Sequence, residues 1–242
     1  MDGSASVMQP EVAPRPAGDA LVFGIMAASR PLSRDRLTVL RAVRAALMSL
    51  ARTADGGVLP LFSGHGEGPG PARPGDHRHV YIAALDDDGD GRLDQILVMA
   101  PWRVDRGVAP TDDNRADFAR VTGRLALVRA GAAGVLTLAP PLPLPGERGR
   151  VWLSRTPYRP TRHPAKGADA ATFVVEDVRR ECARRGLPAP SGAQPLMIRP
   201  GPRGGLSARL CLSFTEPVAG PLLLGRDAHR GGGLFSASVP LD

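Results

Sequence analysis

Two apolar runs separated by an aspartate-rich segment constrain the fold of this chain more than any other feature. Val80–Leu85 and Ile96–Ala100 have the length and composition of strands, and Asp86–Asp94 lies between them. Strand-like runs joined by a short segment of turn-forming residues predict a β-hairpin. A hairpin holds side chains at its end in place, which suits a binding or catalytic site.

Three of the five histidines of the chain gather just before this hairpin. His65 lies in a Gly/Pro-rich loop, and His77 and His79 stand where the first strand begins. Because His77 and His79 are two positions apart, they would share one face of the strand. The spacing does not fit a zinc site, which needs cysteines or a fixed His/Glu pattern on a helix. Ordinary polar residues and catalytic acid–base groups are both open interpretations.

The aspartate-rich segment also has two interpretations. Its Asp-x-Asp-x-Asp-Gly pattern matches part of an EF-hand calcium loop, with the candidate cation ligands Asp86, Asp88, Asp90 and Asp94. Such a loop ends in a bidentate glutamate at its twelfth position, where this chain has Leu97. We therefore expect a tight acidic turn whose side chains cap backbone N–H groups, with any cation bound weakly.

The charge of the chain favours a polyanionic partner. The 242 residues carry a formal net charge of +7, almost all from arginine, since Lys166 is the only lysine. A basic balance of this kind is typical of nucleic-acid binding, although a GC-rich coding sequence would also enrich arginine. Aromatic residues make up only 4%, so few side chains are present to stack on bases.

Composition and cysteine usage also bear on location. No apolar run reaches the ~20 residues of a membrane-spanning helix, and we find no signal peptide pattern at the N-terminus. Cys182 and Cys211 lack metal-ligand spacing. We therefore expect a cytoplasmic protein with reduced cysteines, no membrane partner and no cofactor.

Hydrophobic periodicity predicts the order β-α-β-β-α-β in the first half. The expected elements are a strand at Ala20–Ala28, a helix from Arg34 to about Arg52, the hairpin, a helix from Thr111 to about Ala130, and a strand at Val135–Ala139. This order is the ferredoxin-like arrangement. The prolines of 140–145 predict a stiff, extended linker after it.

The second half repeats this order without its last helix. The expected elements are strands at Val151–Thr156, Gln194–Arg199, Leu206–Phe214 and Leu234–Val239, and a helix from about Ala170 to Arg185. A glycine-rich loop, Gly220–Gly233, stands in place of the second helix. We predict an α+β fold of tandem ferredoxin-like modules with antiparallel sheets. Its parts are a disordered tail (1–18), a first module with the histidine loop (19–139), a proline-rich linker (140–150) and a second module with the glycine-rich loop (151–242).

Two loops of the second half are candidates for holding phosphate. The glycine-rich loop carries Arg226, His229 and Arg230, and its closely spaced glycines Gly231, Gly232 and Gly233 would let backbone N–H groups approach an anion. The alternative is a flexible surface loop, which would not need this charge between apolar flanks. The basic loop 159–166 offers Arg159, Arg162, His163 and Lys166.

Together these segments resemble a known family. Paired ferredoxin-like, RRM-like modules with a glycine-rich loop before the last strand are similar to the RAMP superfamily of CRISPR-associated RNA-binding proteins. More specifically, the chain resembles the C-terminal half of the type I-G (formerly I-U) fusion of a backbone-type RAMP with a repeat-processing RAMP. The resemblance lies in Arg30–Met48, FSGH with the hairpin, VWLSRTPYRPTRHPAK, Val178–Pro188 and GPLLLGRDAHRGGGLF.

The resemblance implies a metal-independent endoribonuclease that cleaves precursor crRNA within the CRISPR repeat, as part of antiviral defence. In such enzymes the ribose 2′-OH attacks the adjacent phosphate, which requires a base, an acid and nearby cations. It implies His79 first, then His77 and His65, as catalytic groups, with Arg73 and Arg78 supplying charge to the phosphate.

The implied partners are CRISPR repeat RNA, the crRNA product and other subunits of an effector complex. Two alternatives stay open at this point. One is a non-catalytic RNA-binding RAMP subunit of a CRISPR ribonucleoprotein. The other is a calcium-binding interaction module built on the acidic turn.

Overall fold

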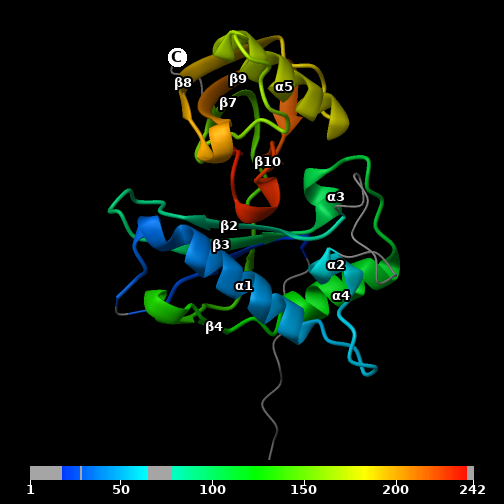
Figure 1. Ribbon diagram of the computed structural model, residues 1–242. Helices are drawn as coiled ribbons and strands as arrows, with labels where there is room; N and C mark the ends of the chain where they lie inside the picture. Colours follow the sequence, from blue (N-terminus) through cyan, green and yellow to red (C-terminus); the bar gives the residue numbers. More distant parts are fainter. Residues whose placement is uncertain (1–17, 28, 65–77, 239–242) are drawn as a thin grey trace, which may run out of the picture.

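The first module is built on a sheet in the order β2-β3-β1-β6, in which all neighbouring strands are antiparallel. The computed structural model describes residues 18–27, 29–64 and 78–238. The strands are β1 (Ala20–Gly24), β2 (Tyr81–Leu85), β3 (Gln95–Met99) and β6 (Leu142–Pro143). One face is covered by helix α1 (Arg36–Leu50), helix α4 (Asp112–Thr122) and a hairpin of β4 (Leu127–Arg129) and β5 (Val135–Thr137) (Figure 1). Two short helices, α2 (Pro60–Ser63) and α3 (Pro101–Val104), flank the sheet.

The end of the first module differs from the sequence-based expectation. Helix α4 stops at Thr122 rather than continuing to Ala130, and the chain forms the β4–β5 hairpin instead. Gly131 and Gly134 adopt positive φ angles of 56° and 89°, which close this hairpin between the strands. The fourth strand of the sheet is β6, which pairs with β1. It lies within 140–150, the segment expected to be a linker. Prolines are tolerated there because β6 is an edge strand.

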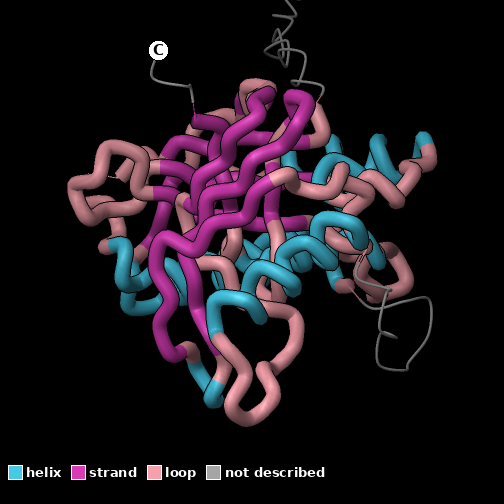
Figure 2. The backbone as a smooth tube through the Cα atoms, turned by 90° about the horizontal axis from the view of Figure 1, so that it is seen from above, coloured by secondary structure: helices cyan, strands magenta, loops and turns pink. Residues whose placement is uncertain are grey.

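The second module has the corresponding antiparallel sheet, with one extra edge strand. Its order is β10-β11-β7-β9-β8, and Figure 2 looks down on these strands. The elements are β7 (Arg148–Ser154), α5 (Ala170–Arg184), β8 (Gly192–Pro200), β9 (Leu206–Ala219), β10 (Leu222–Leu223) and β11 (Leu234–Ser238). The expected α+β class with antiparallel sheets is confirmed. Among the described helices, none combines the length and apolar character needed to cross a membrane.

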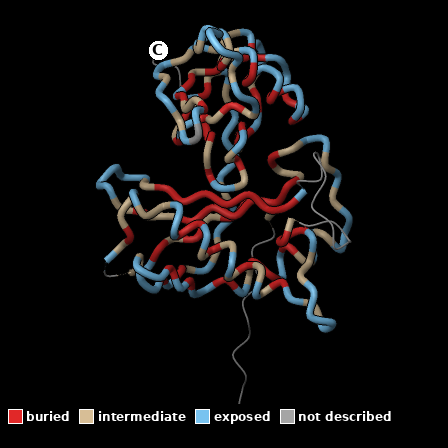
Figure 3. The backbone as a smooth tube through the Cα atoms, in the orientation of Figure 1, coloured by how far each residue is buried: buried red, intermediate tan, exposed pale blue. Residues whose placement is uncertain are grey.

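The two modules meet across the open face of the first sheet. Ile82 and Ala84 of β2 pack toward α1, whereas Tyr81 and Ala83 pack against the second module. The strands β2 and β3 are therefore buried on both faces, as their red colour in Figure 3 shows. The second module contributes Leu223, Ala228 and Leu234 to this contact, all from β10, β11 and the segment between them. The glycine-rich loop thus lies at the junction of the modules.

Candidate functional site

A histidine of the glycine-rich loop lies between two side chains at the start of β2. The ring centroid of His229 is 3.9 Å from that of His79, with 14° between the planes, and 3.9 Å from that of Tyr81, with 16°. Residues two apart in a strand share a face and are separated by roughly 6.6 Å. That spacing leaves room for one ring between the two. The stack therefore joins His79 of the first module to His229 of the second.

Close backbone packing holds His79 in place. Gly64, which ends α2 with φ at 73°, lies so near that a Cβ there would come within 2.8 Å of His79 Nδ1. The backbone N–H of Val80 donates to the Leu61 carbonyl, which ties the start of β2 to α2. His79 is 7% exposed as a result. The close approach of the His79 ring thereby explains the glycine of the FSGH segment.

The glycines of the loop place His229 against β2. A Cβ on Gly231 would lie 2.9 Å from Ala83 Cα, and a Cβ on Gly233 would overlap the Leu224 carbonyl oxygen. The Thr156 hydroxyl donates to the Gly231 carbonyl over 2.7 Å. Gly231 and Gly233 are buried, so packing explains these glycines, and direct phosphate contact by the two is not supported. Gly232 is only half-buried.

A cavity lined by arginines adjoins His229. Its volume is about 130 Å³. The lining residues are Leu37, Leu40, Arg41 and Arg44 of α1, Ile82 of β2, Arg159, Asp227, His229 and Arg230. Burial, and then the positive charge of Arg230, hold the pKa of Arg44 below its ordinary value. Four guanidinium groups around one carboxylate make this cavity suited to an anion.

The carboxylate of that cavity is already engaged. Arg159 Nη1 donates to Asp227 Oδ2 over 2.6 Å, within the second module. Arg44 Nη2 donates to the Ser63 carbonyl over 2.5 Å, which orients it beside α2. The approach of the glycine-rich loop makes Arg41 and Arg44 of α1 part of the wall of a cavity.

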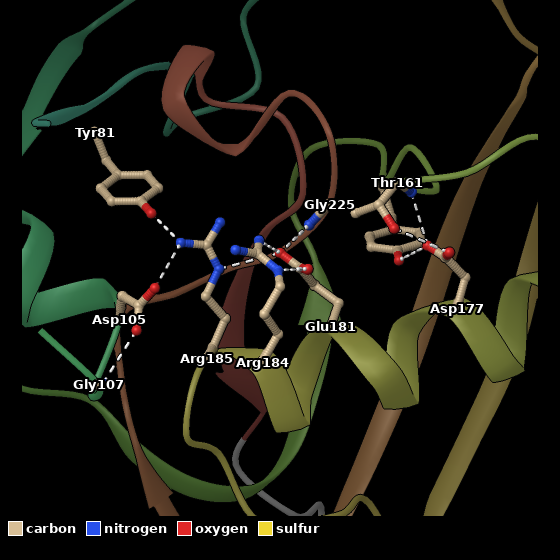
Figure 4. Close-up of polar contacts among 10 residues, drawn as sticks. Tyr81, Asp105, Gly107, Thr161, Asp177, Glu181, Arg184, Arg185 and Gly225 are labelled. Atoms are coloured by element: carbon tan, nitrogen blue, oxygen red, sulfur yellow. Dashed lines mark hydrogen bonds and ion pairs between the residues drawn. The ribbon is translucent and has the colours of Figure 1, made fainter. Parts of the chain in front are cut away.

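The basic loop 159–166 lies next to the glycine-rich loop. Arg226 donates to the Thr161 carbonyl over 3.1 Å and lies 3.2 Å from His163 Nε2. Buried Asp177 of α5 fixes the loop by accepting from the Thr161 amide over 2.8 Å (Figure 4). It also accepts from Arg162 Nε over 3.3 Å. The structure therefore brings together the two segments predicted to contact phosphate. Arg162, His163, Lys166, Arg226 and Arg230 are exposed.

The side chain of Arg30 holds the acidic turn together. Arg30 forms ion pairs with Asp88 at 3.7 Å, with Asp90 at 2.9 Å and with Asp94. The turn's side chains also accept from backbone N–H groups, as expected, for example Asp86 Oδ2 from Gly91 over 3.0 Å. Carboxylate oxygens of Asp86, Asp88 and Asp94 lie within 4.8 Å of one another, so Arg30 supplies positive charge where a metal ion would. Sequence reasoning missed Arg30, which follows β1 and is distant from the turn along the chain.

Several predicted residues lie outside the described part of the chain: His65, His77 and Arg73. Arg78 is described and exposed, next to His79. Conversely, the structure adds Tyr81 and Arg44, which sequence reasoning did not select. Tyr81 could have been found from its position two residues after His79, which puts both side chains on one face.

Comparisons with known proteins give two distant likenesses. No protein-family model matches the sequence, and no curated protein matches it. The fold is similar to a solved structure named CRISPR associated protein Cas6, with 8% identity and a TM-score of 0.48, covering 91% of this chain and 98% of that one. It is also similar to Csf5, CRISPR-Cas type IV Cas6 crRNA endonuclease, with 16% identity and a TM-score of 0.39 over the same shares.

Proposed function

We propose that this protein binds RNA along the junction of its two modules and cleaves it without a metal ion. The observation that carries this proposal is the His79–His229 stack beside the arginine-lined cavity. A histidine pair can supply a base and an acid near neutral pH. Arginines adjacent to it would stabilise the charge that develops on a phosphate during attack by the 2′-OH.

The substrate to test first is CRISPR repeat RNA, because of the sequence resemblance to repeat-processing RAMP proteins. In this reading His79 remains the leading catalytic group, and His77 and His65 are further candidates. Arg78, Arg159, Arg162, His163, Lys166, Arg226 and Arg230 would hold the RNA backbone, with Arg73 and Gly232 as additional contacts. We further propose that the product crRNA stays bound and joins other subunits of a type I-G effector complex.

A second function, RNA binding without cleavage, is favoured by one observation. His79 is 7% exposed and its ring is covered by His229, so the scissile phosphate would have to reach the pair from the cavity side. A protein that only binds RNA would use the same arginines and would need no access to His79. The two functions therefore share a surface and differ in whether the histidines react.

The deciding experiment is single-turnover cleavage of radiolabelled repeat RNA in excess EDTA. The proposal predicts cleavage with a 2′,3′-cyclic phosphate on the 5′ product, and no cleavage when a 2′-deoxy sugar precedes the cut. Binding without cleavage would support the non-catalytic function instead. Loss of the fold in EDTA would support the calcium-dependent module, and normal cutting of the deoxy RNA would exclude attack by the 2′-OH.

A further inference from the structure

A buried arginine of the second module reaches across the junction to Tyr81. Arg185 follows the last residue of α5 and is 3% exposed. Its Nη1 donates to the Tyr81 hydroxyl, and its guanidinium carbon lies 5.1 Å from the centroid of the Tyr81 ring. Tyr81 is the ring on which His229 stacks. Arg185 therefore contacts Tyr81, which is one of the two rings between which His229 is stacked.

Two carboxylates hold Arg185 in this position. Glu181, 2% exposed, accepts from Arg185 Nε over 3.1 Å, and Asp105 of the first module lies 3.6 Å away (Figure 4). The same Glu181 oxygen accepts from the Gly225 amide over 3.1 Å, so it also fixes the start of the segment that carries His229. Glu181 thus orients both Arg185 and the loop that carries His229.

Neutralising Glu181 does not require Arg185. Arg184 makes two hydrogen bonds of 2.7 Å to the Glu181 carboxylate, and about half of its side chain is exposed (51%). Burying a second guanidinium costs several kcal/mol unless its partners are well placed. Unlike Arg184, the buried Arg185 reaches the first module, where it contacts Asp105 and Tyr81. Burial raises the pKa of Tyr81, so its ring stays a neutral phenol beside the histidines.

We propose that Arg185, acting through Tyr81, is a positioning residue for the His79–His229 pair. The catalytic part of this inference depends on the proposed function, whereas the geometric part does not. Tyr81 lies between Arg185 and His229, and fixing its ring fixes how far His229 can move from His79. A misplacement of about 1 Å at reacting groups can cost 10²-fold in rate. The second module would thereby control chemistry performed by a histidine of the first.

The test compares Arg185→Met with Arg184→Met, a matched control on the same helix with the same Glu181 partner. Two measurements are made on each folded variant: the ring C–H signals of His79 and His229 by NMR, and single-turnover cleavage at saturating RNA. Arg185→Met should shift the His229 signals and lower the cleavage rate by about 10-fold to 10²-fold, with unchanged RNA affinity. Arg184→Met loosens Glu181 but keeps the contact of Arg185 with Tyr81, so it should change both measurements less than Arg185→Met does.

Tyr81→Phe keeps the test decisive if Arg185→Met does not fold, because it removes only the hydroxyl that Arg185 contacts. It should move the His229 signals in the same direction as Arg185→Met and lower the cleavage rate without lowering RNA affinity. Unchanged histidine signals in both Arg185→Met and Tyr81→Phe would overturn the inference. If the wild-type protein does not cleave RNA, the proposed function fails, but the NMR comparison still decides whether Arg185 positions the stack.

Discussion

The two modules share a strand order but differ in what lies between their third and fourth strands. In the first module this connection contains helix α4 and the β4–β5 hairpin, which cover the sheet of their own module. In the second module it contains β10 and the glycine-rich loop, which lie against β2 of the other module. In the first module this connection covers its own sheet, whereas in the second module the loop packs against the other module and joins the two.

This difference has a consequence for the candidate site. The first sheet is covered on both faces, and one of these covers carries His229. His79, just before β2, and His229 on the loop come together only because the loop leaves its own sheet. We therefore expect the first module to supply a reactive group on a fixed backbone and the second to supply its partner and much of the RNA contact.

The strongest way to break the junction is Gly233→Ala. A Cβ there would overlap the Leu224 carbonyl oxygen, and φ is +60°. Strain and overpacking should lower the free energy of unfolding by about 3 kcal/mol, measured by urea denaturation. Gly146→Ala is the control, since nothing lies within 4 Å of its added Cβ. Equal stability of the two variants would mean that the loop does not pack tightly on its neighbours.

The second prediction separates chemistry from binding. His79→Ala should lower single-turnover cleavage of repeat RNA by about 10²-fold or more, with little change in RNA affinity. His163→Ala, an exposed histidine of the second module, should weaken binding but keep the rate at saturating RNA. If His79→Ala retains the full rate, the catalytic group lies elsewhere, and His229→Ala becomes the next variant to measure.

A third, smaller effect concerns the salt dependence of binding. Arg226→Ala with Arg230→Ala should lower the slope of log affinity against log salt by about 1.4, because each phosphate contact to single-stranded RNA contributes about 0.7. Arg124→Ala with Arg129→Ala removes the same charge from exposed positions beyond α4 and should leave the slope unchanged. Equal slopes for the two double variants would exclude the loop as the RNA contact.

The smallest effect is expected at the acidic turn. Because Arg30 pairs with three aspartates and Leu97 replaces the usual glutamate, calorimetric titration of the wild-type protein with calcium should show no tight site. Arg30→Gln should strengthen the affinity, but only to the weak range of about 10⁻⁴–10⁻³ M. Sub-micromolar binding by the wild-type protein would contradict an arginine-held turn.

Much of the local structure followed from the sequence, because its causes are local. Helix α1 lies within the predicted range, and Asp169 begins α5 by accepting from the Thr172 amide. Helix α5 ends before Gly186, whose φ of 67° is the left-handed conformation expected after a helix. The apolar runs before and after the acidic turn also indicated strands, and β2 and β3 form there.

Tertiary structure decided the rest, because it depends on which distant segments meet. Over the few residues after Thr122, the apolar spacing fits either a continuing helix or a hairpin strand. The chain forms the hairpin, whose buried side chains pack in one core with α1. A glycine cluster has the same pattern whether it approaches a phosphate or another backbone. Only the atoms of Ala83 and Leu224 show that Gly231 and Gly233 serve packing. Likewise, His79 and His229 are separated by most of the chain, so periodicity gave no signal that their rings would stack.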